Sequence, residues 1–175
     1  MAIKYSSTNY FESETSRSLK LAEKALKQFM WFRVPDTKTL QFGSGSDKII
    51  APKVPCDYIS LYKGRAYFLE CKSLKSNATS YSFRYIRPHQ LDYLQKAEKC
   101  GGKGYFLICN RYHRNDIEAF AVHPWEIQRW MNEGKKSITW ERLRRCINLK
   151  PTHNEKGYAC WDLKALFNKH TVFRC

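Results

Sequence analysis

The sequence predicts one domain of the α/β or α+β class, in which a central mixed β-sheet is flanked by helices. The chain has 175 residues, an ordinary length for one domain, and 43% of them are hydrophobic, enough for a single core. Helical and strand-like hydrophobic periods follow one another in the order helix, β-hairpin, helix, two strands and helix. No repeat or low-complexity tract divides the chain. We therefore expect a single domain over 1–175, with a core at about 9–122 and a C-terminal extension at about 123–175.

The first half of the chain contains a helix, a loop and a hairpin. Apolar residues recur every three or four positions between Asn9 and Met30, which predicts an amphipathic helix. The stretch from Pro35 to Pro55 is rich in Gly, Ser, Pro and Lys, which is typical of a mobile loop beside a functional face. The segments 56–62 and 66–72 are rich in aromatic and branched residues and flank Lys63-Gly64-Arg65, so they predict a β-hairpin with a three-residue turn.

The second half continues with alternating helices and strands. A short helix is expected to begin at Pro88 and to end before Gly101-Gly102, and another is expected to begin at Pro124. Between them, residues 105–109 and 118–122 have the composition of strands. Weaker patterns predict a short strand and helix within Ser137–Cys146, a strand at Tyr158–Trp161 and a terminal helix at Asp162–His170.

The charge of the chain predicts a polyanionic partner. Lys and Arg number 31 against 16 Asp and Glu, which gives a net charge of +15 on a small domain. Such an excess favours nucleic acid over the alternative of a merely solubilising surface. No apolar run approaches the ~20 residues of a spanning helix and no signal-peptide core begins the chain, so we expect a cytoplasmic protein without a membrane partner. The seven widely spaced cysteines include no CxxC, so neither a zinc knuckle nor a disulfide framework is indicated, and no small-molecule cofactor is expected.

The predicted hairpin carries residues that suit phosphodiester hydrolysis. Side chains alternate along a strand, so Glu70 and Lys72 share one face, and Asp57 on the partner strand is expected near them. Two carboxylates and a backbone carbonyl, for which we name Cys71, are hard oxygen ligands for Mg²⁺, and Mn²⁺ is expected to substitute. Lys72 is expected to orient the attacking water or to stabilise the phosphorane. The alternative is a solvated Glu-x-Lys pair on a strand surface.

These motifs resemble those of the PD-(D/E)XK nuclease superfamily. Pro55-Cys56-Asp57 resembles an interrupted PD element and Glu70-Cys71-Lys72 an E-x-K element. Within the superfamily, the sequence is most similar to Holliday junction resolvases of the archaeal type and their RecU-like relatives. Further matches are Phe11-Glu12, the loop Gly43–Ser46, His89-Gln90 and Gly101-Gly102. The resemblance spans about residues 9–110 and implies a restriction-endonuclease-like core of order αβββαβ with C-terminal additions.

Helix geometry assigns two further candidates. Glu12 lies seven residues before Leu19, on the expected core-facing stripe, so it is a candidate third carboxylate of the metal site. An acidic residue favoured by the helix dipole is the alternative, and Glu14, about 200° around the axis, fits that alternative better. Gln90 aligns with Leu94 on its helix, and its amide is expected to hold the attacking water or Lys72. A first-turn capping role is the competing account.

Candidate DNA contacts lie in the loop and after the E-x-K element. Ser44 or Ser46 is expected to contact the scissile phosphate, although serines in flexible loops usually have no specific role. The basic candidates are Lys48, Lys53, Lys75, Arg84 and Arg87. The alternating Tyr81, Phe83 and Tyr85 fit two accounts equally, stacking on an unpaired base or packing of a strand on the core.

The leading hypothesis is a Mg²⁺-dependent resolvase that cuts four-way DNA junctions as a homodimer. A symmetric dimer matches a substrate with two equivalent strands to cut. A restriction- or repair-type endonuclease with the same metal chemistry is the alternative within the enzyme class. A non-catalytic nucleic-acid-binding module, in which the cluster only ties the hairpin together, is the alternative from another class.

Overall fold

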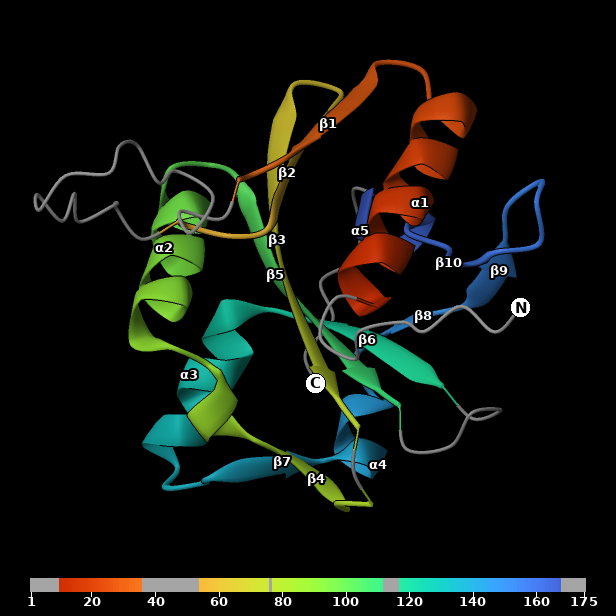
Figure 1. The fold of residues 1–175 in the computed structure, drawn as a ribbon. Helices are drawn as coiled ribbons and strands as arrows, with labels where there is room; N and C mark the ends of the chain where they lie inside the picture. The colour runs from red at the N-terminus through yellow and green to blue at the C-terminus, as the bar shows by residue number, and fades with distance from the viewer. Residues whose placement is uncertain (1–9, 36–53, 76, 112–116, 168–175) are drawn as a thin grey trace, which may run out of the picture.

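A six-stranded mixed sheet forms the centre of the computed structural model, which describes residues 10–35, 54–75, 77–111 and 117–167 (Figure 1). The strand order is β1-β2-β3-β5-β6-β8, in which β3 and β5 are parallel and the other neighbours antiparallel. The strands are β1 (Phe29–Arg33), β2 (Tyr58–Tyr62), β3 (Arg65–Leu74), β5 (Lys103–Asn110), β6 (Glu118–Val122) and β8 (Ile147–Leu149). The predicted fold class, a mixed sheet flanked by helices, is confirmed.

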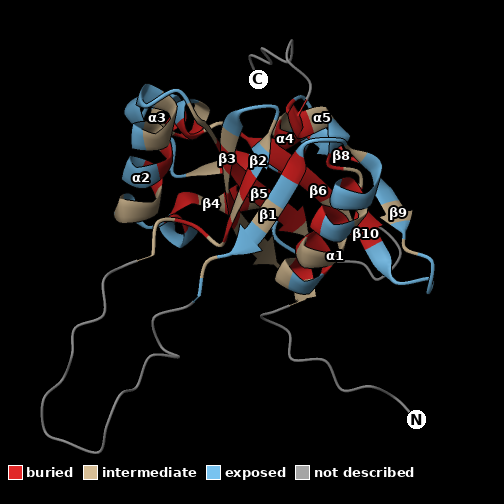
Figure 2. Cartoon of the chain, turned by 90° about the horizontal axis from the view of Figure 1, so that it is seen from above, coloured by how far each residue is buried: buried red, intermediate tan, exposed pale blue. Residues whose placement is uncertain are grey.

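Helices cover both faces of this sheet. In Figure 1, α1 (Tyr10–Ala25) and α5 (Lys164–Phe167) lie on one side, while α2 (Pro88–Lys99) and α3 (Pro124–Asn132) lie on the other. Each face has its own core, because β5 is buried on both sides: Leu107 packs with the α1 core and Ile108 with the α2 core. Figure 2 shows the central strands as buried, whereas the outer surface of α2 is exposed.

The hairpin of β2 and β3 is tighter than predicted. Lys63 and Gly64 have φ values of 49° and 77°, and Tyr62 pairs with Arg65, so the loop has two residues instead of three. Positive φ at both positions matches the right-handed twist of the strands. The ladder ends at the pair Tyr58 and Leu69, and Asp57 therefore lies next to the position opposite Glu70.

The first helix is shorter than predicted. Helix α1 ends at Ala25, the chain turns at Gln28 with φ 60°, and β1 follows along β2. The helical spacing of Phe29 and Met30 with Leu26 was misleading, because Phe29 is buried as a strand residue and Met30 is 53% exposed. The predicted loop at Pro35–Pro55 lies mostly in 36–53, outside the described residues.

The segment after α3 completes the sheet and the α1 core. The predicted strand and helix within Ser137–Cys146 are β7 (Ser137–Thr139) and α4 (Trp140–Leu143), and β7 pairs with β4 (Ser80–Ser82). Strand β8 was not predicted, nor was β9 (Pro151–His153), which pairs with β10 (Ala159–Trp161). Trp161 and Phe167 are buried in the α1 core.

Two findings concern membrane-spanning helices and thiols. In the part of the chain that the structure describes, no helix is long and apolar enough to cross a membrane. Cys56, Cys71, Cys100, Cys109 and Cys160 are free thiols, whereas Cys146 is disulfide-bonded.

Candidate active site

Asp57 and Glu70 lie side by side at the point where β2 begins. The Asp57 N–H donates to the carbonyl of Leu69 at 3.1 Å, which extends the hairpin ladder by one step and brings Asp57 opposite Glu70. The Asp57 carboxylate then accepts the N–H of Cys71 at 2.6 Å, beyond the last pair of the ladder. The hairpin register thus fixes both carboxylates relative to one backbone.

Glu70 is 3% exposed, and its described partners hold it through one of its oxygens. Lys72 Nζ donates to Oε1 of Glu70 at 2.8 Å, and the amide nitrogen of Gln90 donates to the same Oε1. Lys72 Nζ also donates to Oε1 of Gln90 at 2.9 Å, which closes a ring of three side chains from β3 and α2. Within the described residues, Oε2 of Glu70 accepts no hydrogen bond. A carboxylate oxygen that lacks a protein donor is suited to an external cation.

The electrostatics of the site favour binding of a cation. The pKa of Glu70 is raised to about 7, first by burial and next by the charge of Asp57, against the opposing effect of Lys72. One ammonium therefore does not compensate two adjacent carboxylates. A divalent cation between them would keep both ionised at neutral pH.

Glu12 lies near this cluster but is engaged elsewhere. Its carboxylate forms an ion pair with Arg33 of β1, and its backbone carbonyl accepts the hydroxyl of Tyr58 at 2.7 Å. The charge of Glu12 also contributes to the raised pKa of Glu70, which shows that the two carboxylates interact. In the described parts of the chain, no group of three His, Cys, Asp or Glu is placed to hold a metal ion.

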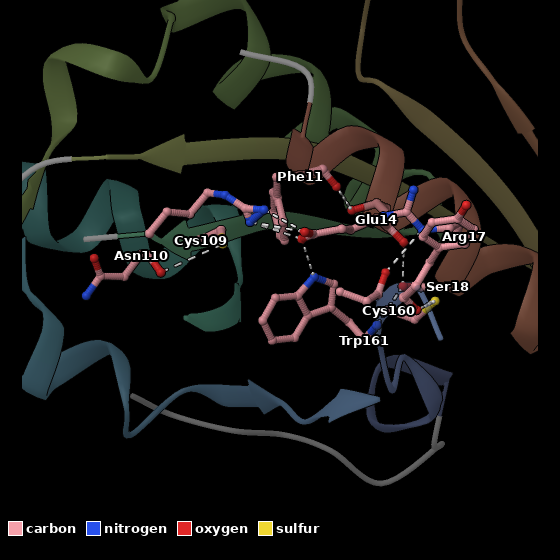
Figure 3. Close-up of polar contacts among 12 residues, drawn as sticks. Phe11, Glu14, Arg17, Ser18, Cys109, Asn110, Cys160 and Trp161 are labelled. Carbon is pink, nitrogen blue, oxygen red and sulfur yellow. Dashed lines mark hydrogen bonds and ion pairs between the residues drawn. The ribbon is translucent and has the colours of Figure 1, made fainter. Parts of the chain in front are cut away.

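The placement of Glu14 contradicts the sequence interpretation. Glu14 was expected to fit the role of an N-terminal helix residue favoured by the dipole, yet it is 4% exposed. Arg111 donates to both of its oxygens, at 2.5 Å and 3.2 Å, and the indole of Trp161 donates to Oε2 at 3.2 Å (Figure 3). These partners are 97 and 147 residues away, so helix geometry alone does not reveal them.

Gln90 fulfils both roles that the sequence left open. Its Oε1 accepts the N–H of Arg87 at 3.3 Å, which caps the first turn of α2, and accepts Lys72 Nζ at the same time. The same amide oxygen therefore caps α2 and binds Lys72 of the cluster. The first turn of α2 fixes the amide that holds Lys72 and Glu70.

The candidate DNA contacts divide into two groups. Lys75, Arg84 and Arg87 are exposed around the segment that links β3 to α2. Ser44, Ser46, Lys48 and Lys53 lie outside the described residues.

The three alternating aromatic residues of this segment also divide. Tyr81 and Phe83 are buried in the α2 core, so the packing account holds for them, while Tyr85 is 39% exposed.

The sequence did not indicate the partners of Arg33, Arg111 or Trp161. Arg33 closes an aromatic strand directly before the loop, but no local pattern indicates that it pairs with Glu12. Arg111 directly follows β5, and Trp161 ends β10, so only the assembled sheet brings them to Glu14.

Comparison with known proteins identifies the family. The model of the family RecU, Recombination protein U, matches residues 37–156, well over half of the chain. The chain belongs to this family. The resemblance to RecU-like proteins is thereby confirmed, and the match extends beyond residue 110, although Glu12 precedes it.

Curated RecU proteins are similar over part of their length. The Holliday junction resolvase RecU of Mycoplasmopsis pulmonis is 30% identical over 100 residues, which are 57% of this chain and 59% of that protein. The protein of the same name from Oceanobacillus iheyensis is 32% identical over 105 residues, 57% of this chain and 51% of that protein. The aligned part thus spans between half and three fifths of these relatives. Among solved structures, Archaeoglobus fulgidus Hjc, an archaeal Holliday junction resolvase, matches with a TM-score of 0.44 at 18% identity, over 79% of this chain and 93% of that one.

Proposed function

We propose that the chain is a metal-dependent endonuclease that cuts four-way DNA junctions. The observation that carries this proposal is the ring of Glu70, Lys72 and Gln90 with Asp57 beside it, in a chain of the RecU family. The net charge of +15 supplies the attraction to a DNA backbone that such an enzyme needs. The names of the curated relatives support a junction as the substrate.

The donor set suits Mg²⁺, with Mn²⁺ as a substitute. Asp57 and Glu70 would hold the ion together with the carbonyl of Cys71. The N–H of Cys71 points to Asp57, and in an extended strand the N–H and C=O of one residue share an edge, so this carbonyl lies on the side of Asp57. Three hard oxygen donors leave other positions of the ion for water and a phosphate oxygen. When bound, the ion supplies a water of lowered pKa and neutralises charge on the phosphate.

The side chains around the carboxylates have separate tasks. Gln90 holds Oε1 of Glu70 and Lys72 Nζ, so it fixes the direction of both groups before DNA arrives. Lys72 is largely buried, with 15% of its side chain exposed, and its ammonium would stabilise the negative charge that develops on the phosphate. Preorganised charge of this kind stabilises a transition state without a reorganisation cost at the moment of reaction.

A homodimer would allow paired cuts in a symmetric junction. Strand β1 is an edge strand, and its residues on the face away from α1 are apolar and exposed: Met30 at 53% and Phe32 at 47%, beside Leu61 of β2 at 38%. We assign this β1–β2 face to contact with a second copy. In sedimentation experiments, Phe32→Glu should give a monomer, whereas an unchanged dimer would remove this face from the proposal.

The experiment that tests the activity is a cleavage panel with Mg²⁺, with Mn²⁺ and without metal. Its substrates are a four-way junction, a linear duplex, a flap and a single strand at equal concentration. Preferential cutting of the junction, lost in Asp57→Asn but retained in the exposed control Asp92→Asn, is the expected result. Equal cutting of linear duplex would indicate a restriction- or repair-type enzyme. Binding without cutting under either metal would indicate a non-catalytic module.

A further inference from the structure

Tyr85 is an aromatic ring that the structure holds at the surface. It is 39% exposed, although its neighbours Phe83 and Ile86 are buried. The guanidinium of Arg84 lies 4.8 Å from the centre of the ring and donates to the Tyr85 hydroxyl at 2.7 Å. On the core side, the ring of Tyr81 packs against the ring of Tyr85, with 5.8 Å between the ring centres. The ring is therefore oriented before any ligand binds, which lowers the entropy cost of stacking on it.

The chain places this ring close to the candidate active site. Tyr85 lies in the short 3-10 helix Phe83–Tyr85, and Arg87 then caps α2 through Gln90, which holds Glu70. Three extended residues span at most about 11 Å, and residues two apart in a helix lie about 5 Å from each other, so the Cα atoms of Tyr85 and Gln90 are within about 16 Å. Phosphates of one strand advance by about 3.4 Å each along a duplex, so about five nucleotides span this distance.

We propose that Tyr85, held by Arg84, distinguishes branched from linear DNA by stacking on a base that is exposed at the branch point. This inference rests on the proposed function, because it needs branched DNA at the Asp57–Glu70 site. At a branch point a base lacks one stacking neighbour, whereas extracting a base from a duplex costs a few kcal/mol. An exposed ring therefore gains from contact with a junction and gains little from linear DNA. Arg84 adds a positive charge for the adjacent phosphate.

The fold contains a matched control for this pair. Tyr158 is 47% exposed, and the guanidinium of Arg17 lies 5.6 Å from its ring centre. This second Arg–Tyr pair belongs to α1 and the segment before β10, on the face of the sheet opposite Gln90. Replacing Tyr158 thus removes the same kind of surface ring away from the candidate site.

The test measures affinity for a four-way junction and for a linear duplex of equal length by fluorescence anisotropy, in EDTA and at one fixed salt concentration. Tyr85→Ala and Tyr85→Leu should each reduce the preference for the junction by about 5- to 150-fold, the range that corresponds to loss of one base stack. Tyr85→Phe and Tyr158→Ala should retain the preference. A 2-aminopurine scan should locate a fluorescence change within about five nucleotides of the scissile phosphate, lost in Tyr85→Leu.

The outcomes separate this inference from the proposed function. If the wild-type chain prefers junctions and Tyr85→Leu retains that preference, the stacking role of Tyr85 is wrong and the function stands. The stacking role is also wrong if Tyr85→Leu weakens junction and duplex binding equally. If the wild-type chain binds both DNAs alike, the choice of a junction substrate is at fault, and this inference fails with it. Should Tyr85→Ala melt early, the comparison of Tyr85→Leu with Tyr85→Phe decides the matter.

Discussion

Glu14 and Glu70 are two buried glutamates on opposite faces of the same sheet. Their exposures are 4% and 3%, each is paired with a cation, and burial is the main cause that raises the pKa of each. They differ in how their oxygens are used. Both oxygens of Glu14 accept hydrogen bonds from protein donors, whereas Oε1 of Glu70 accepts two and Oε2 none among the described residues.

The difference teaches that burial of a carboxylate does not by itself indicate chemistry. Arg111 and Trp161 satisfy Glu14 completely, and the three groups tie α1 to the ends of β5 and β10 (Figure 3). Glu70 has the like charge of Asp57 beside it. Its Oε2 accepts no hydrogen bond from the described residues. A structural carboxylate is thus recognised by complete hydrogen bonding, and a functional one by a deficit that a ligand can supply.

Replacing the carboxylates of the candidate site should have the largest effect on activity. Glu70→Gln keeps the shape of the side chain but removes the charge that holds the cation, so we expect junction cleavage to fall by at least about 10³-fold. The free energy of unfolding should stay the same or rise, because repulsion from Asp57 is removed. Single-turnover cleavage and thermal melting measure the two quantities. Loss of stability with retained cleavage would reverse the roles assigned to Glu70 and Glu14.

Replacing Glu14 should show the opposite pattern. Glu14→Ala leaves Arg111 buried without its partner, which typically costs about 3–5 kcal/mol of stability. For a chain of this size, each kcal/mol lowers Tm by about 2–4 °C. Cleavage measured well below Tm should change little, and Glu133→Ala at the surface should alter neither quantity. A chain as stable as wild type would show that the contacts of Glu14 do not hold α1 in place.

The sequence predicted the local elements and the cluster better than the long-range contacts. The hairpin, α2 and β5 have strong periodic signals, and strand alternation was enough to place Glu70 and Lys72 on one face. Strand β1 was missed because its residues FMWFR follow a helix directly and the first two of them also fit the helical period. Strand β8 was missed because three residues carry too little pattern.

The misassignment of Glu14 has the same origin. A helical wheel records the spacing of residues on one helix, whereas the burial of Glu14 is decided by residues 97 and 147 positions away. The two roles considered for Gln90, capping α2 and holding Lys72, both depend on its position in the first turn of α2. That position is a local feature, so the sequence predicted both contacts.

The pH dependence of metal binding should sharpen the comparison. The pKa of Glu70 is raised from 4.5 to about 7, so between these values the folded protein binds a proton that the unfolded chain has lost. Stability without metal should therefore fall as pH rises through this window, and Mn²⁺ affinity should increase by up to about tenfold per pH unit. Calorimetric titration of Mn²⁺ at several pH values measures this affinity, and thermal melting without metal measures the stability. In Asp57→Asn the pH window over which stability without metal falls should move lower, because the neighbouring charge that raises the pKa of Glu70 is gone. A pH-independent affinity would show that Glu70 is not a ligand.

Glu12 is the intermediate case, near the site like Glu70 but paired with arginine like Glu14. Because Arg33 already neutralises it, we expect Glu12→Gln to reduce cleavage by only about tenfold, the smaller effect that is typical of groups around a metal ligand. Arg33→Gln should have an effect of similar size, since it releases a further negative charge toward Glu70. Cleavage rates of both variants at saturating Mg²⁺ test this. If Glu12→Gln is as damaging as Glu70→Gln, Glu12 must leave Arg33 during the reaction, and the third-carboxylate role predicted from the helix stripe is the correct one.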